Sequence, residues 1–83
     1  MHLSDELIAE LELLTLFNLD NHLEGLKVHH GAEPRRQAAV QRLHAKGLTS
    51  QADGGYLTSL GRDAAEHAQA LLTILQQRST TPA

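Results

Sequence analysis

The stretch that decides the fold covers residues 34–65 and reads PRRQAAVQRLHAKGLTSQADGGYLTSLGRDAA. Pro34 suits the first position of a helix, because its missing N–H would have no partner within the helix there. Gly47 suits the position just beyond a helix end, because glycine adopts the left-handed conformation without strain. We therefore predict a helix over Pro34–Lys46.

The second part of this stretch predicts a hairpin and another helix. Asp53-Gly54-Gly55 separates two short runs, and a type I′ hairpin turn needs positive φ at both central residues. We expect Leu48–Gln51 to pair with Tyr56–Thr58 across this turn, and Thr58 to cap the helix that follows. A lone hairpin is marginal in water, and the alternating segment Leu26–His29 is the expected third strand.

The N-terminal residues predict a helix with more apolar surface than one small domain can bury. Ser4 is a good N-cap, and Leu7, Leu11 and Leu14 form one stripe at helical spacing. Further apolar residues fall on other sides of this helix, so we expect a second copy of the chain to cover them in a homodimer at micromolar concentration. The expected dimer-interface residues are Leu13, Leu16 and Phe17, together with Leu72 of the last helix.

Length and composition limit the class of protein. Eighty-three residues without cysteine predict one α+β domain over residues 1–78 with a flexible tail over 79–83, and they exclude disulfides and thiolate metal sites. No apolar run is long enough for a membrane span. The acidic N-terminus lacks the basic start of a signal peptide, so we expect a cytoplasmic protein.

No residue pattern for catalysis or metal binding is present. The six histidines include no pair at the spacing that places two ligands on one helix face, and adjacent His29 and His30 would point to opposite faces of a strand. No serine lies in a glycine elbow, and there is no phosphate-binding glycine loop. We therefore expect no enzyme activity, no catalytic residues, no metal and no cofactor.

Charge is divided unevenly along the chain. Residues 1–24 contain six acidic residues and neither lysine nor arginine, whereas residues 25–50 contain five lysines and arginines and one acidic residue. On the predicted helix over Pro34–Lys46, Arg35, Arg42 and Lys46 fall within about 40° of one another. This basic stripe has two interpretations: it is a solvated face, or it contacts nucleic acid. The uneven division of charge along the chain has a further interpretation, that opposite charges attract across the fold or across a dimer.

The segments Arg42–Leu48 and Tyr56–Arg62 resemble winged-helix regulators of the MarR and PadR kind. In those proteins a recognition helix ends in RL..KGL, a β-wing follows, and LT..GR opens the next helix. The resemblance covers about residues 34–68, and the whole chain also resembles a small uncharacterised bacterial family with a winged-helix-like pattern.

The resemblance implies a winged-helix-like α+β fold with three main helices and a two- or three-stranded antiparallel sheet. It further implies a DNA-binding protein that acts on double-stranded DNA, as a transcriptional regulator does. The expected DNA contacts are Arg35, Arg36, Gln37, Gln41 and Arg42 on the recognition helix, with Lys46 from the basic stripe.

A second hypothesis is a dimeric protein–protein interaction module that keeps this fold without binding DNA. Two departures from the family pattern favour it. The helix that normally precedes the recognition helix is replaced by the extended segment near Leu26–His29, and the expected wing over residues 51–55 has no lysine or arginine to hold a phosphate.

Overall fold

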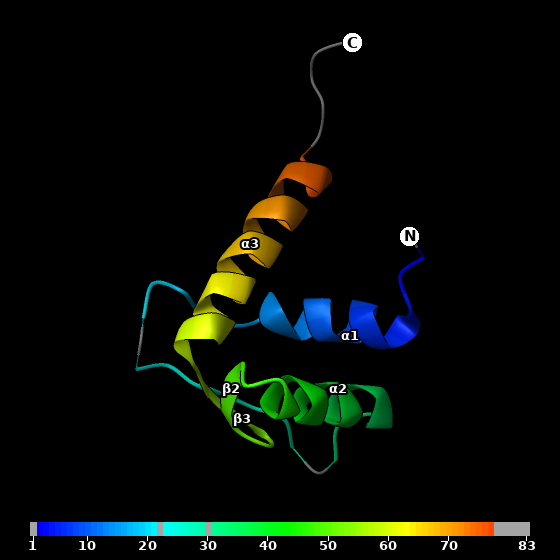
Figure 1. Ribbon diagram of the computed structural model, residues 1–83, viewed down its shortest axis with the longest axis vertical. Coiled ribbons are helices and arrows are strands. Elements are labelled where there is room, and N and C mark those ends of the chain that lie inside the picture. The colour runs from blue at the N-terminus through cyan, green and yellow to red at the C-terminus, as the bar shows by residue number, and fades with distance from the viewer. Residues whose placement is uncertain (1, 22, 30, 78–83) are drawn as a thin grey trace, which may run out of the picture.

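The computed structural model describes residues 2–21, 23–29 and 31–77. Its helices and strands follow one another along the chain as α1 (Asp5–Leu14), β1 (Leu26–Lys27), α2 (Pro34–Ala45), β2 (Thr49–Gln51), β3 (Gly54–Leu57) and α3 (Ser59–Gln76). The fold is therefore α+β with a small antiparallel sheet, as predicted, and the arrangement is compatible with a winged helix (Figure 1).

The core lies where α1, α2 and α3 meet. Leu13 of α1 and Leu43 of α2 are its largest fully buried side chains. Small residues surround them, because Ala39 of α2 and Ala65 of α3 are completely buried and allow the helices to approach closely. The hydrophobic effect over this compact cluster therefore holds the three helices together.

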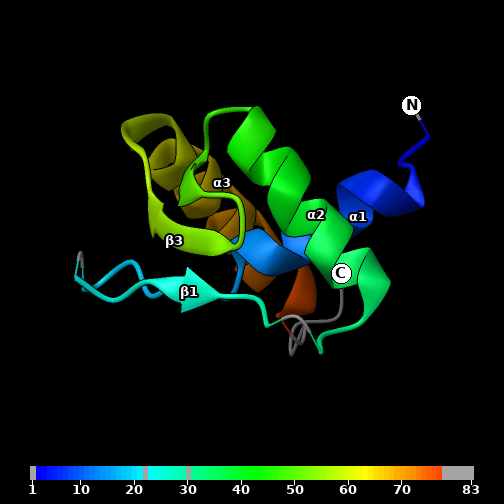
Figure 2. The same cartoon turned by 90° about the horizontal axis from the view of Figure 1, so that it is seen from below.

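The sheet has the strand order β1-β3-β2, and both pairings are antiparallel. Leu26 of β1 lies opposite Gly55 of β3, which confirms the predicted third strand, although β1 is shorter than Leu26–His29. Viewed from below, β1 lies along the edge of the molecule beside β3 (Figure 2). Gly54 is needed at this contact, since a Cβ there would overlap the Leu26 carbonyl oxygen.

The hairpin turn differs from the predicted type I′ turn. Ala52 and Asp53 form the turn, and among the described residues only glycines have positive φ. Gly54 and Gly55, with φ of 127° and 76°, are already in β3, and the pairing register shifts between Thr49 and Gln51. Gly54 and Gly55 therefore lie outside the centre of the turn. Their positive φ angles accompany an irregular pairing of β2 with β3, in which one strand has an extra residue.

The start of α3 is fixed to the end of α2 by two polar contacts and a close approach. The Thr58 hydroxyl accepts a hydrogen bond from the Gly61 N–H at 3.0 Å and donates one to the Gly47 carbonyl at 2.6 Å. A Cβ on Gly61 would overlap the Leu48 carbonyl oxygen, so only glycine fits there. The far half of α3 extends beyond the other elements (Figure 1).

Candidate functional site

The basic stripe of α2 lies against α1. Arg35 donates hydrogen bonds from Nε and Nη2 to the two carboxylate oxygens of Asp5, at 2.9 and 3.0 Å. Its Nη1 donates to Glu12 Oε1 at 2.7 Å. One guanidinium therefore joins two carboxylates from the two ends of α1.

Glu10 of α1 binds the two remaining cations of the stripe. Its side chain accepts hydrogen bonds from Arg42 Nε, at 2.9 Å, and from the Lys46 ammonium. Arg42 also lies 3.7 Å from a carboxylate oxygen of Glu6. Since Glu10 is only 5% exposed, its charge depends on these two partners for the stabilisation that water would otherwise supply.

The pKa values of the paired residues reflect these contacts. Burial alone would raise the pKa of Glu10, but the hydrogen bonds from Lys46 and Arg42 outweigh it and hold this pKa below its usual value. The pKa of Asp5 is lowered by its hydrogen bonds from Arg35. The pKa of Arg35 is raised by its hydrogen bonds to Asp5 and Glu12, so all three groups stay charged at neutral pH.

The predicted DNA contacts are thus divided among different surroundings. Arg35, Arg42 and Lys46 are paired with carboxylates of α1, so the opposite charges of the chain attract across the fold. Gln37 donates to the Ala32 carbonyl, whereas Gln41 lies exposed. Arg36, the remaining predicted contact, is exposed and lines a groove beside α3. Within the described part of the chain, its side chain makes no ion pair.

The acidic partners on α1 were not singled out from the sequence. The available signal was the concentration of acidic residues before residue 25 and of basic residues after it. Each charged set lies on its own helix, so the sequence indicates attraction between the helices but cannot identify which side chains meet. The crossing of α1 and α2 brings Asp5 and Glu12 to one cation and Glu10 to two others.

Two of the four expected dimer-interface residues are wrong. Leu13 is 1% exposed and Phe17 is 5% exposed within the single chain, so neither side chain is available to a second copy. Leu16 is 48% exposed and Leu72 is half-buried. Both line the same groove, of about 540 Å³, between the end of α1 and the far half of α3.

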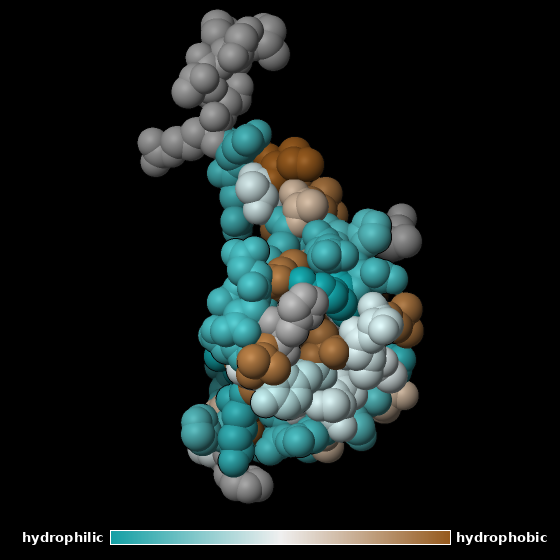
Figure 3. Space-filling model, turned by 90° about the vertical axis from the view of Figure 1, so that its left-hand side faces the viewer, coloured by the Kyte–Doolittle hydropathy of each residue, from teal (hydrophilic) through white to brown (hydrophobic). Residues whose placement is uncertain are grey.

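A line of mostly apolar side chains runs along one flank of α3, where Ala64 packs partly against the core and the larger side chains are exposed. Its members, which we call the α3 seam, are Leu60, Ala64, His67, Leu71 and Ile74. Their spacing alternates between four and three residues, the repeat by which two helices pack in a coiled coil. Leu60, Leu71 and Ile74 are 58%, 53% and 63% exposed. Figure 3 shows hydrophobic side chains gathered at the far end of this helix, just below the grey residues.

The remaining sides of α3 differ from the seam in burial. Ala68 is turned inward and Leu72 is half-buried, whereas Leu60 and Leu71 are exposed. The core side of α3 is thus built from small residues, and its larger aliphatic residues remain on the outside. Large exposed apolar side chains in one line are typical of a surface that contacts another protein.

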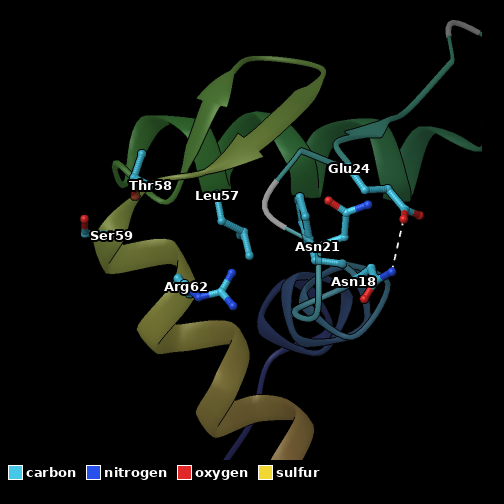
Figure 4. Close-up of a pocket in the computed structure, with 8 residues that line it drawn as sticks. Asn18, Asn21, Glu24, Leu57, Thr58, Ser59 and Arg62 are labelled. Atoms are coloured by element: carbon cyan, nitrogen blue, oxygen red, sulfur yellow. Dashed lines mark hydrogen bonds between the residues drawn. The ribbon is translucent and has the colours of Figure 1, made fainter.

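A second hollow lies between residues 18–24 and the start of α3 (Figure 4), with a volume of about 270 Å³. Several of its polar groups already have partners in the fold. Asn18 donates to Glu24 Oε2 at 3.0 Å, and Arg62 donates to the Leu19 carbonyl while lying 3.9 Å from Glu66. These contacts hold the loop against α3, which is a structural role for the arginine.

Metal sites and membrane-spanning helices are both absent from the described ranges. No group of three or more histidine, aspartate or glutamate side chains is arranged to hold a metal ion there. Among the helices described, none combines the length and the apolar character that crossing a membrane requires.

The three helices and the three-stranded sheet define a small α+β domain of winged-helix-like arrangement. The chain belongs to a family of unknown function (DUF5669), whose match covers residues 1–76. No curated protein matches the chain. No solved structure matches it either.

Proposed function

We propose that this chain is a homodimeric protein–protein interaction module, built on a winged-helix-like scaffold, that does not bind DNA. The observation that carries the proposal is the α3 seam, a 4-3-4-3 line of side chains with Leu60, Leu71 and Ile74 more than half exposed. A second copy of the chain is the partner that presents the same repeat. Two helices with this repeat pack knobs into holes and cover each other's apolar side chains.

The length of α3 also favours pairing between two copies. The helix has 18 residues, so it is about 27 Å long, and its far half extends beyond the body of the domain. A helix in a protein gains most of its stability from packing along an apolar face. The buried residues of α3 are Gly61, Ala65 and Ala68, and all three lie in its first ten residues. A second α3 would supply such packing for the last two turns.

The charges on α2 argue against DNA binding. Major-groove binding requires cations that are free to meet phosphates, and phosphate contacts supply most of the affinity. Three of the four lysines and arginines over residues 34–46 already have carboxylate partners, and the carboxylate of Glu10, which binds two of them, is buried. DNA binding through the basic stripe of Arg35, Arg42 and Lys46 stays an untested prediction from the sequence, and our proposal expects none.

Sedimentation equilibrium over a wide range of protein concentrations tests the dimer. We expect a mass of twice 9.1 kDa for the unmodified chain. Leu71→Glu combined with Ile74→Glu should give a monomer, because each change places a charge on the seam. Leu23→Glu, at an exposed leucine outside the α3 seam, is the control and should remain dimeric. A 9.1 kDa species at the highest concentrations would refute the dimer.

A gel-retardation assay with duplex DNA at low salt tests the second part of the proposal. We expect no retardation, since low salt is the condition that favours DNA binding most strongly. Retardation that disappears in the Arg36→Ala variant, which leaves the ion pairs of α1 and α2 intact, would instead favour the DNA-binding hypothesis.

A further inference from the structure

The middle position of the α3 seam is a histidine. His67 follows Leu60 and Ala64 and precedes Leu71 and Ile74, so two aliphatic positions lie on each side of it. Its Nδ1 lies 2.7 Å from the Asp63 carbonyl oxygen, one turn earlier in the same helix. This contact uses one ring nitrogen and leaves Nε2 for the seam.

We propose, on the basis of the homodimer argued above, that His67 makes pairing through the α3 seam sensitive to pH, with acidification separating the two copies. Histidine is the side chain that ordinarily changes charge between pH 5 and 8. In the separate protomer, the imidazole of His67 is exposed to water. In the dimer, a proton on the same imidazole places a charge between aliphatic side chains, where desolvation opposes it.

The position of His67 makes this effect independent of helix direction. In a parallel pair, equivalent positions face each other, so the two imidazoles share one layer and their charges repel when both are protonated. In an antiparallel pair centred on the seam, each imidazole lies in a central layer opposite a small or aliphatic side chain. In both cases the other seam positions supply no group that could compensate a positive charge.

Neighbouring charged groups do not replace that compensation. On α3, Asp63 lies beside the seam with its side chain exposed, and Glu66 is engaged with Arg62 at 3.9 Å. Of the helices and strands, α1 and β3 pack most extensively against α3, and Arg36 of α2 lines the groove beside its far half. The carboxylates of α1, at positions 5, 6, 10 and 12, all lie within ion-pair distance of α2 cations, and the titratable residue of β3 is Tyr56.

The test measures the dimer dissociation constant by sedimentation at about pH 7.5 and about pH 5.5, the range over which histidine changes charge. We expect the dissociation constant of the unmodified chain to rise at least tenfold on acidification. Both imidazoles must leave the dimer interface before both can be protonated in water. His67→Gln should abolish this dependence. His2→Gln, which removes a histidine before α1, should retain it.

Two further results separate this inference from the proposed dimer. A monomer at both pH values would refute the dimer and this inference with it. A dimer whose dissociation constant is equal at both pH values would refute the inference alone. Tightening on acidification that disappears in Asp63→Asn would also overturn it, because the partner's carboxylate would then be pairing with the imidazolium. Circular dichroism at both pH values checks that the helices stay folded.

Discussion

Glu10 has two cations within hydrogen-bond distance and almost no contact with solvent. Such a carboxylate is stable only while both partners are present, because a buried charge that loses a hydrogen bond keeps its full desolvation cost. Glu12 differs, since it is exposed and meets one end of Arg35. These two glutamates of α1 therefore separate the energetic effect of a buried ion pair from that of a surface pair.

We expect Glu10→Gln to lower the free energy of unfolding by roughly 1.5–3 kcal/mol, because it removes a buried charge from two cations. Glu12→Gln is the matched control and should lower it by less than about 1 kcal/mol, the range of exposed pairs. Urea denaturation of both variants measures the difference. An equal decrease in the free energy of unfolding for both variants would show that the burial of Glu10 does not strengthen its ion pairs.

Gly61 allows a prediction about packing. Gly61→Ala should destabilise the fold by about 3 kcal/mol or more, because its new methyl group would overlap the Leu48 carbonyl oxygen and force α3 away from β2. Gly31→Ala is the comparison, since nothing lies within 4 Å of a Cβ at that position. Thermal unfolding should distinguish the two clearly, and a similar midpoint for both would contradict the close approach of α3.

Among the helices, α2 and α3 were the easiest to predict. Pro34, Gly47 and Thr58 are local signals of helix ends, and each acts at its own position whatever surrounds it. The hairpin and its third strand were also predicted. The exact turn was not, because Gly54 is required by its contact with Leu26, which is distant in sequence.

The cap of α3 predicts a local loss of stability. Thr58→Ala should lower the free energy of unfolding by about 1–2 kcal/mol, because the Gly61 N–H and the Gly47 carbonyl would each lose their hydroxyl partner. Thr58→Ser keeps the hydroxyl and should cost much less. Chemical denaturation compares the two variants, and a serine variant as unstable as alanine would indicate that the threonine methyl group matters more than the cap.

The contacts of the predicted site residues differ from expectation because the partner of each residue depends on how whole helices pack. A helical wheel places Arg35, Arg42 and Lys46 on one face but does not say what faces them. In the folded chain that face meets α1, and Leu13 and Phe17 are buried within the single chain. Side-chain periodicity within one helix therefore identified the faces, while the partner of each face depended on contacts between helices.

Acid should destabilise the molecule as a whole. Asp5 and Glu10 have lower pKa values in the folded chain than their ordinary values of 3.8 and 4.5, so the unfolded chain binds more protons as the pH falls through this range. Their contribution to stability is fully present above these values and is lost as the pH falls through the lower pKa values of the folded state. Urea denaturation across this range should show a shallower pH dependence for Glu10→Gln, and an unchanged dependence would contradict the role of Glu10.

The contact of Glu10 with Arg42 and Lys46 also has a consequence for how the sequence can change over evolutionary time. A neutral residue at position 10 leaves two cations facing each other, and the loss of both cations leaves a carboxylate enclosed without a counter-charge. Either single step reduces stability, whereas exchanging the three positions together for apolar residues of similar size need not. Across the members of the family, positions 10, 42 and 46 should therefore vary together, while position 12 should vary with little regard to them.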